Sequence, residues 1–199
     1  MSPDPRKAQV EIDGRTLTLH RHPANPAEGP VTILMLPMGP AESKPQVFFK
    51  GDFNAESAAF SPDGRYVSFL SQATGQREIY VRPYPESGGQ LTVSVGGGRE
   101  PVWAANGELF YRSLTGEQMF AVSVTTDPAL RVGTPVPLFR GSYFVSPTGS
   151  PRAQYDVASD GQRFLMLAPR PGTDTSVARS HIVVVENWFE ELNRRVPTK

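Results

Sequence analysis

Two histidines two residues apart are the first candidates for chemistry in this sequence. On an extended strand His20 and His22 would share one face, so that both imidazoles could bind the same metal ion. No third ligand is close in sequence, because the remaining histidine is His181 and the chain has no cysteine. We therefore interpret the pair as surface histidines and predict neither a metal site nor a cofactor.

Motifs for phosphoryl and acyl transfer are incomplete. Residues 52–54 (Asp-Phe-Asn) resemble the metal-binding Asp-Phe-Gly of protein kinases, and residues 20–22 (His-Arg-His) lack the aspartate of the catalytic His-Arg-Asp. The sequence contains no glycine-rich kinase loop and no Gly-x-Ser-x-Gly nucleophile turn. Glu190 and Glu191 are adjacent, and on a helix they would point apart rather than act as an acid–base pair. From these absences we expect that the chain is not an enzyme.

The elements that would position such residues are set by a repeated turn. Asp-Gly or Asn-Gly dipeptides stand between apolar runs at residues 13–14, 63–64, 106–107 and 160–161. Glycine at the second position accepts a positive φ, and Pro62 presets the turn that contains Asp63. Repeats of about 40 to 50 residues with several short strands each are typical of β-propeller blades. A β-sandwich is the alternative fold for the same pattern.

The chain is predicted to be all-β, a single propeller domain over residues 1–199. We expect about four blades, at residues 9–50, 57–95, 100–140 and 154–185, followed by a short helix at residues 187–195. The last blade lacks a fourth strand, which predicts an incomplete ring or a piece of a larger propeller. Each end of an open arc would leave one blade face without a neighbour, so we also expect self-association through exposed blade faces.

Charge and composition exclude several classes of function. Lys plus Arg and Asp plus Glu number 20 each, so no basic surface for nucleic acid is indicated. The longest apolar run, residues 31–38, is too short to span a bilayer, so we predict no membrane insertion. The first 22 residues hold no apolar segment typical of a signal peptide. The sequence does not decide the compartment, which we take as cytoplasmic by default, or extracytoplasmic if the chain is the sensor part of a membrane-tethered protein.

Some runs resemble a known family. Residues 60–65 and 78–81 resemble the WD-like propeller repeats of the TolB family. Residues 79–85, 100–103 and 187–192 are similar to the C-terminal propeller of bacterial serine/threonine protein kinases of eukaryotic type. The resemblance implies a non-catalytic binding or sensor module in a kinase-related protein. The accessory propeller of a prolyl oligopeptidase-type hydrolase is the alternative, since those propellers carry similar Ser-Pro-Asp-Gly repeats.

Recognition is expected where the chain crosses between blades, because loops on a rigid scaffold carry most binding residues. The protein or small-molecule partner is not indicated by the sequence. Tyr84, Trp103 and Tyr155 could reach a central channel, but we interpret them as core residues, and residues 96–98 (Gly-Gly-Gly) as a flexible crossing. The charged residues predicted on the binding face are Asp52, Glu56, Arg77, Arg99, Glu100 and Arg152.

Overall fold

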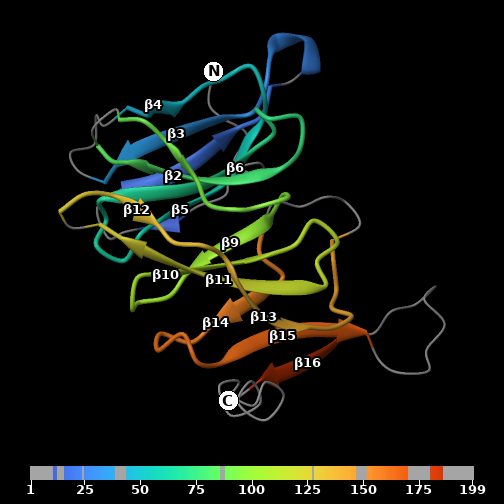
Figure 1. Ribbon diagram of the computed structural model, residues 1–199. Coiled ribbons are helices and arrows are strands. Elements are labelled where there is room, and N and C mark those ends of the chain that lie inside the picture. Colours follow the sequence, from blue (N-terminus) through green and yellow to red (C-terminus); the bar gives the residue numbers. More distant parts are fainter. Residues whose placement is uncertain are drawn as a thin grey trace.

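The computed structural model of this chain is built almost entirely from strands (Figure 1). It describes residues 11–12, 16–23, 25–38, 44–85, 88–126, 128–146, 152–169 and 180–185. These residues form sixteen strands and one short 3-10 helix, η2 (Pro26–Glu28). The strands are arranged in four antiparallel sheets that follow one another along the chain. The predicted all-β fold of propeller type is therefore confirmed.

The first two sheets have four strands each, in sequence order. The first sheet consists of β1 (Glu11–Ile12), β2 (Thr16–Arg21), β3 (Thr32–Pro37) and β4 (Gln46–Phe49). The second consists of β5 (Ala55–Phe60), β6 (Tyr66–Ser71), β7 (Glu78–Pro83) and β8 (Leu91–Thr92).

The third sheet has one strand more than expected. It contains β9 (Arg99–Trp103), β10 (Glu108–Arg112), β11 (Gln118–Thr125) and β13 (Val136–Arg140), and the extra β12 (Arg131–Val132) pairs with the end of β11. The fourth sheet has β14 (Tyr155–Val157), β15 (Phe164–Pro169) and β16 (Ser180–Val185) among the described residues. The helix predicted at residues 187–195 and the turn at Asp13-Gly14 lie outside the described residues.

The Asx-Gly turns connect the first and second strands of their sheets. Gly64, Gly107 and Gly161 have φ values of 68°, 87° and 72°, in the left-handed region that glycine tolerates best. Each of these amide N–H groups donates to the carbonyl three residues earlier, as from Gly64 to Ser61 at 2.8 Å. The predicted turn conformation at Gly64 and Gly161 is confirmed.

The pairing of the first and second strands shows which residues occupy equivalent positions in different sheets. Phe60 pairs with Val67 in the second sheet, and Ile12 pairs with Leu17 in the first. Successive strand residues point to opposite faces, so one set of positions faces the preceding sheet and the other faces the following sheet. Val67 and Phe69 pack towards the first sheet, whereas Tyr66 packs towards the third. This two-sided burial explains why all six residues of β6 are buried.

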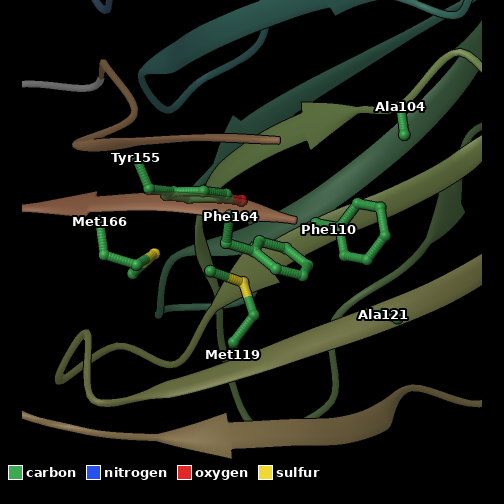
Figure 2. Packing of buried hydrophobic residues seen from close by; sticks show 7 residues of the cluster. All are labelled: Ala104, Phe110, Met119, Ala121, Tyr155, Phe164 and Met166. Atoms are coloured by element: carbon green, nitrogen blue, oxygen red, sulfur yellow. The ribbon is translucent and has the colours of Figure 1, made fainter. Parts of the chain in front are cut away.

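Three apolar clusters fill the spaces between successive sheets. Ile33 and Met35 of the first sheet pack against Phe69 of the second, and Ile79 of the second packs with Tyr111 of the third. Figure 2 shows the third cluster, in which Phe110 and Met119 of the third sheet meet side chains of the fourth. The rings of Phe110 and Phe164 meet edge to face, with centroids 5.1 Å apart. The fourth-sheet members of this cluster are Tyr155, Phe164 and Met166.

The order of the sheets in space follows the sequence. Figure 1 shows the first sheet and the fourth sheet at opposite ends of the row, with the second and third between them. β5 packs against both the first sheet and β9, and β9 in turn packs against β14. Within the described residues no helix is long and apolar enough to cross a membrane.

Candidate functional site

The six predicted binding residues all lie at one end of the sheets, which we call the crossing end. At this end the chain passes from one sheet to the next, opposite the Asx-Gly turns. Asp52 lies between β4 and β5, Arg77 precedes β7, and Arg152 precedes β14. Glu56 is in β5, whereas Arg99 and Glu100 begin β9. Whether these residues bind a partner stays a prediction.

Arg99 and Glu100 form an ion pair inside the protein. Arg99 Nε lies 3.1 Å from Glu100 Oε1, and the Glu100 side chain is only 1 % exposed. Glu100 also accepts from Arg112, whose Nη1 lies 2.9 Å from Glu100 Oε2. These two predicted binding residues are therefore held in a buried network, and their charges are compensated within the chain.

The network connects the third sheet with the start of the fourth. Arg112 donates through Nε to the carbonyl of Gly116 at 2.7 Å and through Nη1 to the carbonyl of Phe144 at 3.0 Å. The hydroxyl of Tyr155 donates to the Glu100 carbonyl at 2.8 Å, and burial raises the pKa of Tyr155. Glu100 adopts a left-handed φ of 58°, which is unfavourable for a residue with a side chain. The hydrogen bonds from Tyr155 to the Glu100 carbonyl and from Arg112 to the Glu100 carboxylate hold this conformation.

A cleft at the crossing end lies between the first and second sheets. It has a volume of about 530 Å³ and is open to solvent. One wall is the segment between β2 and β3, and the other is the crossing between β4 and β5. The carboxamide of Asn54 joins the two walls, because its Oδ1 accepts from the Val31 amide at 2.9 Å. The lining residues are His22, Pro23, Gly29, Pro30, Val31, Asp52, Phe53, Asn54 and Gln72.

Three polar side chains in this cleft are not used by the fold. The side chains of His22, Asp52 and Gln72 make no hydrogen bond or ion pair with any residue that the structure describes. Next to Asp52, the ring of Phe53 is 46 % exposed. A carboxylate, an imidazole and a carboxamide beside an exposed ring provide hydrogen-bond donors and acceptors together with an apolar contact. Of the six predicted binding residues, Asp52 is therefore the one that lines this cleft.

The two histidines do not form the surface pair that the sequence indicated. His20 is within β2 and only 4 % exposed, whereas His22 lies after the end of the strand. His20 Nε2 accepts from the Ala58 amide of the second sheet at 3.2 Å. Burial, together with the charges of His22 and Arg152, lowers the pKa of His20 from 6.5 to about 4. The interpretation of His20 as a surface residue is wrong, because its ring packs between two sheets.

A second depression, of about 370 Å³, lies at the opposite end between the turns of the second and third sheets. Its polar side chains stabilise those turns. Asp63 accepts from Ser61 Oγ at 2.6 Å and from Thr126 Oγ1 at 3.1 Å. Trp103 Nε1 donates to Ser68 Oγ at 2.9 Å. Because these groups already have partners, the depression offers fewer free polar groups than the cleft at the crossing end.

Among the described residues no group of three or more histidine, aspartate or glutamate side chains could hold a metal ion.

Tyr155 lies in the third apolar cluster, and Trp103 and Tyr84 pack against the other two, which confirms their interpretation as core residues.

Similar solved structures support the fold. No protein-family model matches the chain, and no curated protein matches it. A functionally unknown protein from Desulfotomaculum acetoxidans is 9% identical with a TM-score of 0.53, covering 91% of this chain and 56% of its own. A protein from Bacteroides fragilis, provisionally assigned as a 6-phosphogluconolactonase, is 14% identical with a TM-score of 0.51, covering 89% and 52%. The chain therefore spans about half the length of these structures.

Two further structures resemble the chain less closely. A gluconolactonase from Xanthomonas campestris is 16% identical with a TM-score of 0.48, covering 83% of this chain and 57% of its own. A prolyl endopeptidase is 15% identical with a TM-score of 0.47, covering 87% and 29%.

These names correct one expectation. The expectation that the chain is not an enzyme rests on missing kinase and serine-hydrolase motifs. The Bacteroides fragilis protein of the same fold is provisionally assigned as a 6-phosphogluconolactonase, so the absence of those two motif sets does not exclude catalysis. The expectation that the chain is not an enzyme is therefore wrong, because missing sequence motifs for some chemistries do not exclude others.

Sequence reasoning missed several residues of the crossing end. His22 was considered only as a metal ligand, and Gln72 and Phe53 carry no motif of their own. A weak signal for the cleft was available, since residues 23–30 are rich in proline, which predicts a long loop between two strands. Arg112 gave no signal, because an arginine at the end of a strand is normally exposed.

Proposed function

We propose that this chain provides a propeller-type recognition module that binds a polar ligand in the cleft between its first and second sheets. The observation that carries the proposal is the set of three polar side chains, His22, Asp52 and Gln72, which line a preformed depression without serving the fold. Unpaired polar groups that converge on one hollow are typical of binding sites.

The size and chemistry of the cleft define the ligand class. A volume of about 530 Å³ lies within the range of small-molecule sites. Asp52 accepts hydrogen bonds, Gln72 donates and accepts them, and Phe53 offers a ring for stacking. A ligand with several hydroxyl or amide groups and one flat or apolar side fits this set, such as a sugar derivative or a short peptide.

Both walls of the cleft are fixed in advance. The Ala55 amide donates to the Val31 carbonyl at 3.1 Å, next to the bond between Val31 and Asn54. Inside the long loop, the Ala27 amide donates to Asn25 Oδ1 at 3.0 Å. A ligand would therefore meet a site that is already shaped, which lowers the entropic cost of binding.

The experiment is a binding screen with matched variants. Thermal-shift and calorimetric titrations would use gluconolactone, gluconate, common monosaccharides and a set of dipeptides. A compound that binds should lose at least tenfold in affinity with Gln72→Ala and with Asp52→Asn. Gln90→Ala is the control, because Gln90 is another half-buried glutamine, placed before β8 and outside the cleft. Equal loss in both glutamine variants, or no binding by any compound, would contradict the proposal.

Turnover can be measured in the same samples. One structure of this fold is provisionally assigned as a 6-phosphogluconolactonase, so lactone hydrolysis is a reasonable assay to include. Hydrolysis that follows the cleft variants would make the module catalytic, and binding without hydrolysis would make it a sensor.

The proposal includes a kinase-related parent protein, which only the sequence resemblance of residues 79–85, 100–103 and 187–192 supports. It would be tested by asking whether genes that encode this sequence pattern also encode a kinase domain. If such domains are absent from the genes, the kinase link fails, while the cleft proposal is unaffected.

A further inference from the structure

The first sheet has an apolar face that no described part of the chain covers completely. Thr18 and His20 of β2 contact Ala58 of the second sheet, so the alternate residues of β2 face away from it. Leu17 and Leu19 are those alternate residues, and both are only half-buried. The strand register continues the face across the sheet, pairing Leu17 with Leu36, Leu19 with Leu34, and Leu34 with Val47.

The corresponding positions in later sheets are buried against the preceding sheet. Val67 and Phe69 in the second sheet are 0 % exposed, and Leu109 and Tyr111 in the third are also 0 % exposed. Phe164 and Met166 in the fourth are 1 % and 0 % exposed. In contrast, Leu34 and Leu36 are half-buried and Val47 is 58 % exposed. The first sheet thus carries the type of face that three other sheets use for sheet packing.

The fourth sheet has the complementary face. Phe164 and Met166 pack against the third sheet, so Leu165 and Leu167 face away from it. Leu165 is 40 % exposed and Leu167 is half-buried. The positions that correspond to Leu165 in the second and third sheets, Ser68 and Phe110, are both 0 % exposed.

We propose that two copies of this chain associate head to tail, with the first sheet of each copy packed on the fourth sheet of the other. The contact would continue the packing that already occurs between the first and second, second and third, and third and fourth sheets. Leucine and valine side chains form the centre of both faces, with Arg21 at the end of β2 on the first and Asp156 beside Leu165 on the fourth. Figure 1 shows the two sheets at opposite ends of the row, so that they do not meet within one chain. Applied across two copies, the same relation between neighbouring sheets gives a closed pair when the four sheets turn through half a circle, and that closed pair is the assembly we propose.

The area favours a closed pair over a single contact. A face of three or four strands, each about 17 Å long and about 4.8 Å from the next, covers roughly 250 to 300 Å². Two contacts in a closed pair would bury about 1,100 Å² in total, which approaches the size of stable interfaces. One contact would bury about half as much, in the range of crystal-packing contacts.

Sedimentation velocity over a range of concentrations tests the proposal with two pairs of matched variants. Val47→Glu places a charge on the first-sheet face, and Val136→Glu places it on β13 at a similarly exposed valine, 52 % against 58 %. Leu165→Glu changes the fourth-sheet face, and Leu91→Glu is its control on β8, with exposures of 40 % and 41 %. We expect a dimer for the parent chain and both controls, and at least tenfold weaker dimerisation for Val47→Glu and Leu165→Glu.

Mixing the two face variants distinguishes head-to-tail from head-to-head contact. A mixture of Val47→Glu and Leu165→Glu keeps one undamaged contact, so it should associate more strongly than either variant alone. All four positions are exposed, so the far-UV spectrum of each variant should match that of the parent. A parent chain that stays monomeric at all concentrations would overturn the proposal. Face variants that dimerise like their controls, or a mixture no stronger than its components, would also overturn it.

Discussion

The guanidinium of Arg112 and the carboxylate of Glu100 form a buried ion pair, with Nη1 2.9 Å from Oε2 and both side chains 1 % exposed. Glu100 Oε2 also lies 3.4 Å from the backbone amide of Gln154, just before the fourth sheet. The pair therefore fixes the start of β9, the end of β10 and the entry to the next sheet at one point. Its position at the crossing end makes it a support for the loops there rather than an exposed recognition group.

Removing one partner of this pair should be costly. Arg112→Leu would leave the Glu100 carboxylate buried with Arg99 as its remaining charged partner, and would remove the Arg112 donor from the carbonyls of Gly116 and Phe144. We expect a loss of about 3–5 kcal/mol in the free energy of unfolding, measured by urea denaturation. The control is Arg140→Leu, which breaks the exposed pair with Glu117 and should cost about 0–1 kcal/mol. Similar losses in both variants would show that the buried pair has no special role.

A second prediction concerns the effect on stability of replacing Gly161, in the Asx-Gly turn of the fourth sheet. Gly161 has a φ of 72°, and a Cβ there would lie 2.9 Å from Asn106 Nδ2 and 3.0 Å from Glu108 Oε2. Gly161→Ala should therefore lower the free energy of unfolding by about 1–2 kcal/mol, through backbone strain and displacement of the third-sheet turn. Gly89→Ala is the matched control, because its φ is not positive and a Cβ would meet nothing within 4 Å. Calorimetric melting of both variants would show the difference, and equal melting temperatures would contradict the turn assignment.

The fold could be predicted from the sequence because its signals are local. Asp63-Gly64 and Asp160-Gly161 determine tight turns through the backbone preferences of two residues each. The strands that follow these turns are apolar at consecutive positions, which indicates burial on both faces. Irregular edges were less predictable, since β8 ends at Thr92 and β12 was missed. Short edge strands depend on pairing with a neighbour rather than on their own composition.

The candidate site was only partly predictable, because burial of charge depends on contacts distant in sequence. Glu100 looks like a loop residue until Arg112 and the segment before the fourth sheet close over it. His20 looks like a surface histidine until Ala58 of the next sheet contacts its ring. The cleft is formed by two segments more than twenty residues apart, joined by the bond between Val31 and Asn54. No local pattern specifies that contact.

The last prediction concerns the stability of the protein in mild acid. Burial, with the nearby charges of His22 and Arg152, lowers the pKa of His20 to about 4, whereas the unfolded chain should protonate this ring near 6.5. Between these values the unfolded state binds the proton more readily, so stability falls as the pH falls. The contribution is fully present above about pH 6.5 and should be lost towards pH 4, with a magnitude on the order of 3 kcal/mol.

His20→Gln isolates this contribution, because the amide oxygen of glutamine can still accept from the Ala58 amide but does not titrate. Urea denaturation at several pH values should show a clear slope between pH 6.5 and 4 in the parent chain and a much smaller slope in His20→Gln. His22→Gln is the comparison, because it removes one of the charges that lower the pKa of His20 but leaves the burial of His20 unchanged. Its slope should lie between those of the parent and His20→Gln. A His20→Gln slope equal to the parent's would mean that another group causes the acid sensitivity, and the buried neutral imidazole would then not be what stabilises the contact between the first two sheets.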